Sequence, residues 1–273
     1  DALHLNNKVF TPAEVPSKGH LAIDKEGELA HGDFNYASVN GQLNYLQGHS
    51  RPDLCHAVAQ TSRYVHAPRR SHELALIRIG SYLKGTHDKG IILRPNKEGT
   101  FVTNIYVDAN FAGGWGTELG TNPDSVKSRT GYIIDVANVP ILWISRMQGG
   151  IACSTMEAEY TALSMSLRAA IPFLDLLKEV ATGLNYTKSR QLTFAATVHE
   201  DNQGALILAR LEPGRHTPRS KYYALKLHWF RAWLLPKKIN IKFVDTLNQR
   251  ADFLTKTLSP VLFKRNRFLS MGW

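Results

Sequence analysis

The order of strand and helix patterns after Pro95 is the feature that most constrains the fold of this chain. Residues 101–107 are β-branched and aromatic, which predicts a strand. Residues 131–136 and 141–145 are two further strand-like runs separated by a short turn, so we expect a hairpin. Residues 154–177 carry an apolar stripe at helical spacing and predict the longest helix.

The remaining patterns complete the order of elements. We expect a strand at 194–198, helices at 202–211 and 220–235, a strand at 239–244 and a helix at 248–258. Three consecutive strands joined to two strands that follow helices indicate a mixed sheet. The predicted class is therefore α/β, a five-stranded sheet with an antiparallel start and parallel additions, flanked by helices.

The first third of the chain has a different texture. Residues 1–33 show no sustained period, and they predict an extended lead-in. Apolar residues at helical spacing from Phe34 to about Leu93 predict three short helices packed as a small bundle. The predicted organisation is a lead-in, a helical region, an α/β domain and a basic C-terminal tail, at 1–33, 34–97, 98–260 and 261–273.

The distribution of charge along the chain indicates a partner that carries phosphates. The chain has a formal net charge of +10, and residues 215–267 hold thirteen Lys and Arg against two acids. Such a density of positive charge favours contacts with phosphates, and a solvated basic surface is the alternative.

No apolar run approaches the length of a membrane span. Cys55 and Cys153 are the only cysteines, too few for a disulfide framework or a zinc site.

Four acids stand out by their positions. Asp108 and Asp201 follow predicted strands, and Glu159 and Asp252 lie in the first turns of predicted helices. Carboxylates at strand ends and helix starts can converge on one spot. Four oxygen ligands suit hard cations such as Mg²⁺ or Mn²⁺. Taken singly, each acid could instead be a strand end, a surface residue or a partner of a helix dipole.

Several motifs resemble the ribonuclease H domain of copia-type LTR retrotransposons, a part of their reverse transcriptase. The likeness covers about residues 34–260, with the motifs in the same order. The upstream part is similar to the thumb or connection helices of that family. The motifs of the ribonuclease H part are Tyr106-Val107-Asp108-Ala109, Ser154-Thr155-Met156-Glu157-Ala158-Glu159-Tyr160, Glu200-Asp201-Asn202-Gln203 and Ala251-Asp252-Phe253-Leu254-Thr255-Lys256.

The resemblance implies a ribonuclease H-like fold, a substrate and residue roles. Asp108, Glu159, Asp201 and Asp252 correspond to the catalytic acids, which would hold two Mg²⁺ or Mn²⁺ ions and cleave the RNA strand of an RNA–DNA hybrid. The expected substrate contacts are Asn202, Gln203, Lys221, Lys226, Arg231 and Lys256. Further implied properties are the polymerase part of the same polyprotein as a partner, and an intracellular location in a cytoplasmic particle or the nucleus.

Glu157 and Glu159 compete for one role. They are two residues apart, so on a helix their side chains point about 200° apart and cannot both face the same ions. The family pattern places the ligand directly before the aromatic residue, Tyr160. We therefore expect Glu159 to be the ligand and Glu157 to act as a capping or surface acid.

Two departures leave alternatives open. The loop before Asp252 has no His, which cellular members of the fold often carry there. No polymerase palm with paired aspartates precedes residue 34, so we expect a fragment of a polyprotein or a remnant with another use. The rival hypotheses are a retroelement-derived nucleic-acid-binding or scaffold protein without turnover, and a nuclease that cuts other duplexes.

Overall fold

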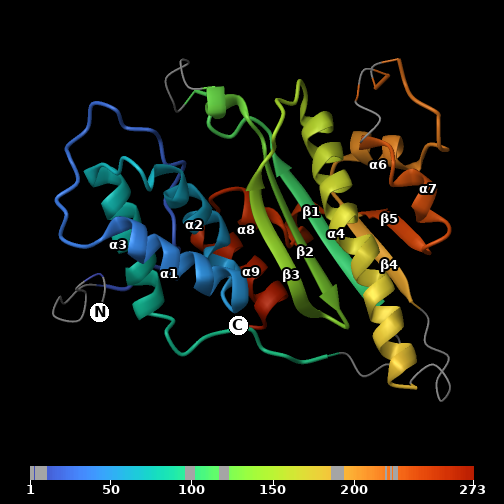
Figure 1. The fold of residues 1–273 in the computed structure, drawn as a ribbon, viewed down its shortest axis with the longest axis horizontal. Helices are drawn as coiled ribbons and strands as arrows, with labels where there is room; N and C mark the ends of the chain where they lie inside the picture. The colour runs from blue at the N-terminus through green and yellow to red at the C-terminus, as the bar shows by residue number, and fades with distance from the viewer. Residues whose placement is uncertain are drawn as a thin grey trace.

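A central sheet separates two layers of helices (Figure 1). The computed structural model describes residue 3 and residues 11–95, 102–116, 123–185, 194–218, 220, 221, 223 and 227–273. One layer holds α4 (Thr155–Gly183), α6 (Gln203–Arg210) and α7 (Arg231–Leu234). The other holds α1 (Tyr36–His49), α2 (Cys55–Thr61), α3 (Arg70–Lys84), α8 (Asp252–Thr255) and α9 (Pro260–Met271).

The sheet has five strands in the order β3-β2-β1-β4-β5. β1 pairs antiparallel with β2 and parallel with β4, and β5 continues the parallel part. This is the mixed sheet that the sequence predicts, so the fold class is confirmed. The bounds are β1 Val102–Asn110, β2 Arg129–Val136, β3 Val139–Met147, β4 Ala195–Glu200 and β5 Ile239–Phe243.

The hairpin between β2 and β3 is tighter than the sequence pattern predicts. Ala137 and Asn138 both have positive φ, 52° and 67°. Left-handed backbone at both central residues is the type I′ geometry, which matches the twist of the flanking strands. Pro140 lies in β3, which is an edge strand, where a residue that cannot donate a ladder hydrogen bond is tolerated.

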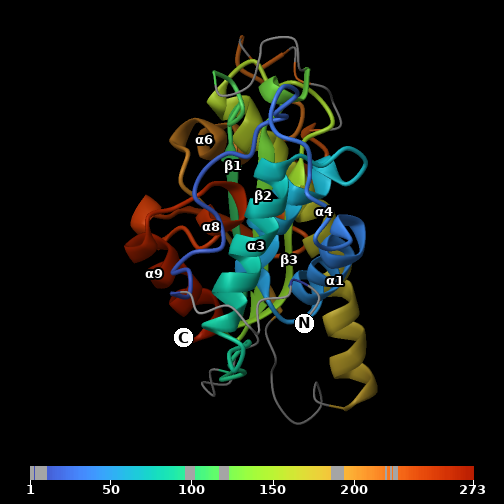
Figure 2. The same cartoon turned by 90° about the vertical axis from the view of Figure 1, so that its left-hand side faces the viewer.

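Alternating side chains of β1 and β2 build two cores, one on each face of the sheet. Ile105, Val107 and Ile134 pack with α4. Ile133, on the opposite face, packs with Phe253 and Phe263 and with apolar residues of α1, α2 and α3. The helical bundle therefore shares a core with the sheet, and Figure 2 shows α1 and α3 lying over that face.

The lead-in is fastened to the bundle by side chains. Gln60 of α2 accepts the Leu21 N–H at 2.7 Å and donates to the Gly19 carbonyl at 3.2 Å. Tyr64 donates to the Leu21 carbonyl at 2.7 Å. Over 11–33 the chain has no helix, and it forms one isolated β-bridge, between Leu29 and Arg69. Among the described residues, no helix combines the length and apolar character that crossing a membrane requires.

Two helix predictions are wrong in extent. Of the described residues in 220–235, only Arg231–Leu234 form an α-helix. Thr217 and Ser220 instead close a local turn through their hydroxyl groups, an alternative to helical hydrogen bonding. The helix predicted at 248–258 is restricted to α8, because Lys256 adopts an extended backbone.

The segment predicted as a basic tail forms helix α9. Ser259 caps its first turn and Pro260 occupies the first helical position, which favours helix initiation at this point. Phe263 anchors α9 in the core that it shares with the bundle.

Candidate metal centre

β1 delivers Asp108 to the site. Its side chain is on the face of β1 opposite Val107, and it is only 2 % exposed. The Thr255 hydroxyl of α8 donates a hydrogen bond to Asp108 Oδ2. Gln249 Nε2 donates to the carbonyl of Val107 at 2.8 Å and to that of His199 at 3.4 Å. One amide group therefore ties the ends of β1 and β4 to the segment that carries Asp252.

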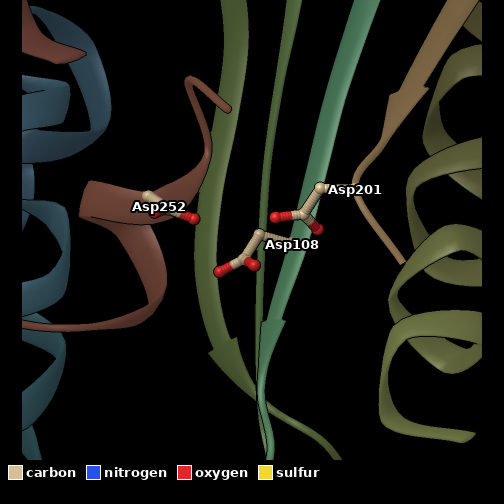
Figure 3. A group of neighbouring side chains, drawn as sticks. All are labelled: Asp108, Asp201 and Asp252. Carbon is tan, nitrogen blue, oxygen red and sulfur yellow. The ribbon is translucent and has the colours of Figure 1, made fainter. Parts of the chain in front are cut away.

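Asp108, Asp201 and Asp252 meet although they are far apart in the sequence. One carboxylate oxygen of each lies within 4.8 Å of the other two. Figure 3 shows the three side chains pointing toward one another from β1, from the end of β4 and from α8. The Thr246 hydroxyl orients Asp201 by donating to its Oδ2 at 3.2 Å.

Glu159 joins the cluster through Asp201. Carboxylate oxygens of Glu159, Glu200 and Asp201 form a second group with all separations within 4.8 Å. Asp201 is common to both groups, so the structure brings the four predicted acids together. Glu159 lies in the second turn of α4 and is buried.

Glu200 is a fifth acid that the sequence reasoning missed. It is the last residue of β4 and is fully buried. The predicted strand ended at Val198, which left Glu200 in a loop. Extending the strand by two residues places Glu200 on the buried face with Val198, because side chains alternate along a strand. This alternation is the signal that could have identified Glu200.

Mutual repulsion and burial perturb these acids. Burial, followed by the charges of Asp108 and Glu200, raises the pKa of Glu159 to about 11. Burial and Asp108 raise the pKa of Asp252 to about 7, and the same two causes raise the pKa of Asp201. Burial raises the pKa of Glu200 well above its ordinary value. The carboxylate forms are therefore costly unless positive charge is supplied.

The site fits divalent cations. Glu159 Oε2 and Glu200 Oε2 are buried and have no hydrogen-bond partner in the described part of the chain. Buried polar atoms are normally satisfied, so two such oxygens beside three aspartates indicate a place for a ligand. The donor set consists of carboxylate oxygens, which Mg²⁺ and Mn²⁺ prefer.

Lys256 supplies one positive charge to the cluster. Its Nζ lies 2.9 Å from Asp252 Oδ1 and 3.8 Å from Asp108 Oδ1. Burial alone would lower the pKa of Lys256, but Asp108 and Asp252 outweigh burial and leave it raised. The sequence predicts Lys256 as a substrate contact, whereas in the structure its ammonium group faces the acids.

The other predicted contact residues lie in different settings. Asn202 caps α6 by accepting the Ala205 N–H, and Gln203 beside it is exposed. Lys221 is exposed, and Lys226 lies outside the described residues. Arg231 is 4 % exposed and donates to Tyr160 Oη at 2.9 Å and to the Arg215 carbonyl at 2.6 Å. Because its guanidinium is enclosed in this way, the structure argues against Arg231 as a substrate contact.

The Glu157 carboxylate contacts the loop before α4, whereas the cap of the helix is supplied by Ser154. Ser154 Oγ accepts the Glu157 N–H at 3.1 Å, and Glu157 Oε2 accepts the Cys153 N–H at 2.9 Å. The first hydrogen bond caps α4, and the second holds the preceding loop against the helix.

Trp229 also contacts α4. Its Nε1 donates to Ser164 Oγ at 3.1 Å, and its ring packs at the edge of the core.

Comparison with known proteins identifies the relatives of this chain. It is 35 % identical over 229 residues to the retrovirus-related Pol polyprotein from transposon RE2 of Arabidopsis thaliana, covering 84 % of this chain. It is 29 % identical over 272 residues to the corresponding polyprotein from transposon TNT 1-94 of Nicotiana tabacum, covering 96 % of this chain. The chain spans 14 % and 18 % of those two proteins. No protein-family model matches it.

Solved structures with low similarity cover about half of the chain. The crystal structure of LC11-RNase H1 in complex with an RNA/DNA hybrid has 18 % sequence identity and a TM-score of 0.37, covering 56 % of this chain and 93 % of that protein. This likeness is too low to support a functional argument by itself. The family rests on the sequence relatives and the fold class on the sheet topology. Over most of its length the chain is a homologue of copia-type, retrovirus-related Pol polyproteins, with a ribonuclease H-like fold.

Proposed function

We propose that this chain is an endoribonuclease that hydrolyses the RNA strand of RNA–DNA hybrids with the help of two Mg²⁺ or Mn²⁺ ions. The observation that carries the proposal is the convergence of Asp108, Glu159, Asp201 and Asp252 from four separate elements. A structural role gives no reason to gather carboxylates that repel one another. Bound cations would remove that repulsion.

The acids divide the work of holding the ions. Asp201 belongs to both groups of carboxylates, so it would contribute to both cation positions, with Asp108 and Asp252 on one side and Glu159 and Glu200 on the other. Divalent ions supply a water of lowered pKa and stabilise charge on a leaving oxygen. Thr255 and Thr246 hold Asp108 and Asp201 in place through hydrogen bonds. The Lys256 ammonium would neutralise part of the remaining charge.

The hybrid substrate is proposed from the family and from the surroundings of the site. Gln203 and Asn202 directly follow Asp201 at the start of α6, where they would meet the strand that is cut. A contact to the RNA 2′-hydroxyl is what separates RNA from DNA at such a position. We propose Lys221 as a further contact to phosphates, and a polymerase region of the same polyprotein as the partner that supplies hybrids.

Cleavage of labelled duplexes tests this function. We expect the wild type to cut the RNA strand of a hybrid with Mg²⁺ or Mn²⁺ and to be inactive in EDTA. Asp108→Asn, Asp201→Asn and Glu159→Gln should abolish cleavage. Glu179→Gln is the matched control, because Glu179 lies on α4 with Glu159 but is exposed.

Other outcomes point to the rival functions. If the wild type and the Asp108→Asn variant are equally inert on hybrids, the chain is a nucleic-acid-binding or scaffold protein. If the wild type cuts DNA duplexes that contain no RNA, it is a nuclease of different specificity. Either result would overturn the proposal.

A further inference from the structure

Arg129, the first residue of β2, is a buried cation without a buried anion. It is 6 % exposed, and its Nη1 donates to Ser145 Oγ at 3.2 Å. Within the described part of the chain, no carboxylate lies within 4.0 Å of its guanidinium nitrogens. Burying a charge without a partner costs free energy, so such an arrangement requires a reason.

The groups around Arg129 affect its protonation. Burial, followed by the charge of Arg63, lowers the pKa of Arg129 to about 10, and the nearby Cys55 thiol opposes this shift. Burial, Arg129 and His20 together lower the pKa of His56 to about 3, so its imidazole is neutral. Arg129 is thus held beside other nitrogen-bearing groups, an environment that would be stabilised by an anion.

Arg129 is one of the residues that line a small cavity. Its volume is about 20 Å³, which suits a water molecule or the oxygen of a larger group rather than a base. Its lining includes Arg129, Lys127, His20, Asn110, Gly114 and Thr255. Asp124 also lines the cavity, but its Oδ1 is paired with Lys127 Nζ at 2.7 Å.

Gly114 lines the cavity at a point where the backbone lies close to His20 and Ser125. A Cβ built on Gly114 would lie 3.1 Å from His20 Cε1 and 3.1 Å from the Ser125 carbonyl oxygen. A side chain at this position would therefore crowd the His20 ring and the Ser125 carbonyl. Close approach of backbone to a ligand is a common use of glycine.

The cavity adjoins the acid cluster. Thr255 lines it and also donates to Asp108. In the sheet, Asp108 is paired with Gly131 and Asn110 with Arg129, so Arg129 is two residues further along the strand pair. Two residues span ~6.8 Å of an antiparallel strand.

We propose that this cavity is a phosphate subsite, in which Arg129 binds an oxygen of a nucleic-acid backbone close to the cleaved bond. A planar guanidinium matches phosphate geometry better than a point charge does. The assignment to a polyanion, rather than a single small anion, comes from a second hollow. This hollow shares Asp124 with the cavity and is lined by the basic residues Lys25, Arg63, His66 and Arg69. The nucleic-acid part of this inference rests on the proposed function, whereas the phosphate site itself does not.

Arg129→Met separates a ligand-binding role from a structural one. Met keeps an unbranched side chain and removes the charge, so the variant should melt at the same temperature as the wild type or higher when phosphate is absent. Inorganic phosphate should raise the melting temperature of the wild type but not that of Arg129→Met. Arg146→Met is the matched control, because Arg146 is exposed on the neighbouring strand β3 and should retain the phosphate response.

Hybrid binding tests the source of the phosphate. All variants would be made in an Asp201→Asn background, which prevents cleavage and leaves the cavity lining unchanged. We expect Arg129→Met to weaken hybrid binding about 10-fold, the effect of losing one charge-assisted contact. The slope of affinity against salt should fall by about one ion. Arg146→Met should change affinity less than 3-fold.

Several results would overturn the inference. A lower melting temperature of Arg129→Met with an unchanged phosphate response would assign Arg129 a structural role. A lost phosphate response with unchanged hybrid binding would refute the nucleic-acid assignment. If Arg129→Met does not fold, Lys127→Gln is used: an unaltered response to both ligands refutes the site. Because phosphate binding needs no turnover, a chain that cleaves nothing can still pass or fail this test.

Discussion

Two regions of this molecule bury carboxylates, and they treat them in opposite ways. In the bundle, Asp53 accepts two hydrogen bonds from Arg51, at 2.9 and 2.8 Å, and a third from Tyr82 at 2.6 Å. Arg267 of α9 extends this network by donating to Tyr82 Oη at 2.9 Å. At the carboxyl ends of β1 and β4, five carboxylates lie together, and Lys256 is paired with two of them, Asp252 and Asp108.

The way the charges are balanced distinguishes a region that stabilises the fold from a region that serves function. Burial alone would lower the pKa of Arg51, but Asp53 outweighs it and the pKa is raised, which is the mark of a charge held by its partner. At the carboxyl ends of β1 and β4, burial raises the pKa values of the acids, and the neighbouring carboxylates raise them further. The Arg51–Asp53 pair, whose charges are balanced, fixes the position of α9 against the bundle. The acid cluster, whose charges are not balanced, is suited to bind a cation from outside the chain.

The largest effect expected from this contrast concerns Asp108. Asp108→Asn should reduce hybrid cleavage by at least roughly 10²–10³-fold, because it removes a carboxylate that would hold a cation at the reacting phosphate. The metal-free protein should be as stable as the wild type or more so, since one repelling charge is lost. Cleavage rates and thermal unfolding in EDTA check both parts. An active variant would contradict the assignment.

Asp53→Asn should behave in the opposite manner. It leaves the Arg51 guanidinium buried without its anion, and breaking such a pair costs about 3–5 kcal/mol of unfolding free energy. Urea denaturation measures this loss. At a temperature where the variant is still folded, cleavage per folded molecule should stay close to that of the wild type. A variant of unchanged stability would show that the pair does not hold the bundle.

The pH dependence of metal-free stability offers a smaller test. Folding raises the pKa of Asp252 to about 7 and that of Glu159 to about 11. The folded state therefore binds more protons than the unfolded state above pH 4, and this contribution to stability is lost as pH rises. In EDTA the melting temperature should fall between about pH 4 and pH 7, and Mg²⁺ should reduce the fall. A rise in melting temperature over this range that persists in Asp252→Asn would contradict the account.

The smallest predicted effect is that of Glu157→Ala. The substitution removes the acceptor for the Cys153 N–H and should cost about 1 kcal/mol of stability, as the loss of a helix cap does. Cleavage should be unchanged, in contrast to Glu159→Gln two residues away. If Glu157→Ala abolished cleavage while remaining folded, the division of roles between these two acids would be wrong.

The strand order and the four acids were predictable because they depend on local patterns. Asp108 follows a β-branched and aromatic run that predicts a strand. Helix geometry excludes a shared role for Glu157 and Glu159, and the family pattern assigns the role to Glu159. The family likeness supplied the order of the motifs. These signals lie within a few residues of the sites that they identify.

The failures depend on contacts between distant segments. Arg231 resembles a surface cation in sequence, but Tyr160 and the Arg215 carbonyl enclose it. Glu200 required the end of β4 to be placed within two residues, and strand ends depend on pairing with β1 and β5. Helix α9 has a readable start at Ser259 and Pro260, but its reason to persist is a core shared with the bundle.

Anomalous scattering from crystals soaked in Mn²⁺ tests the central claim most directly. We expect two peaks among Asp108, Glu159, Glu200, Asp201 and Asp252, and the loss of at least one of them in Asp201→Asn, since this residue belongs to both groups of carboxylates. Crystals that show no peak at these residues, at Mn²⁺ concentrations that fill ordinary carboxylate sites, would contradict a two-cation centre in this protein.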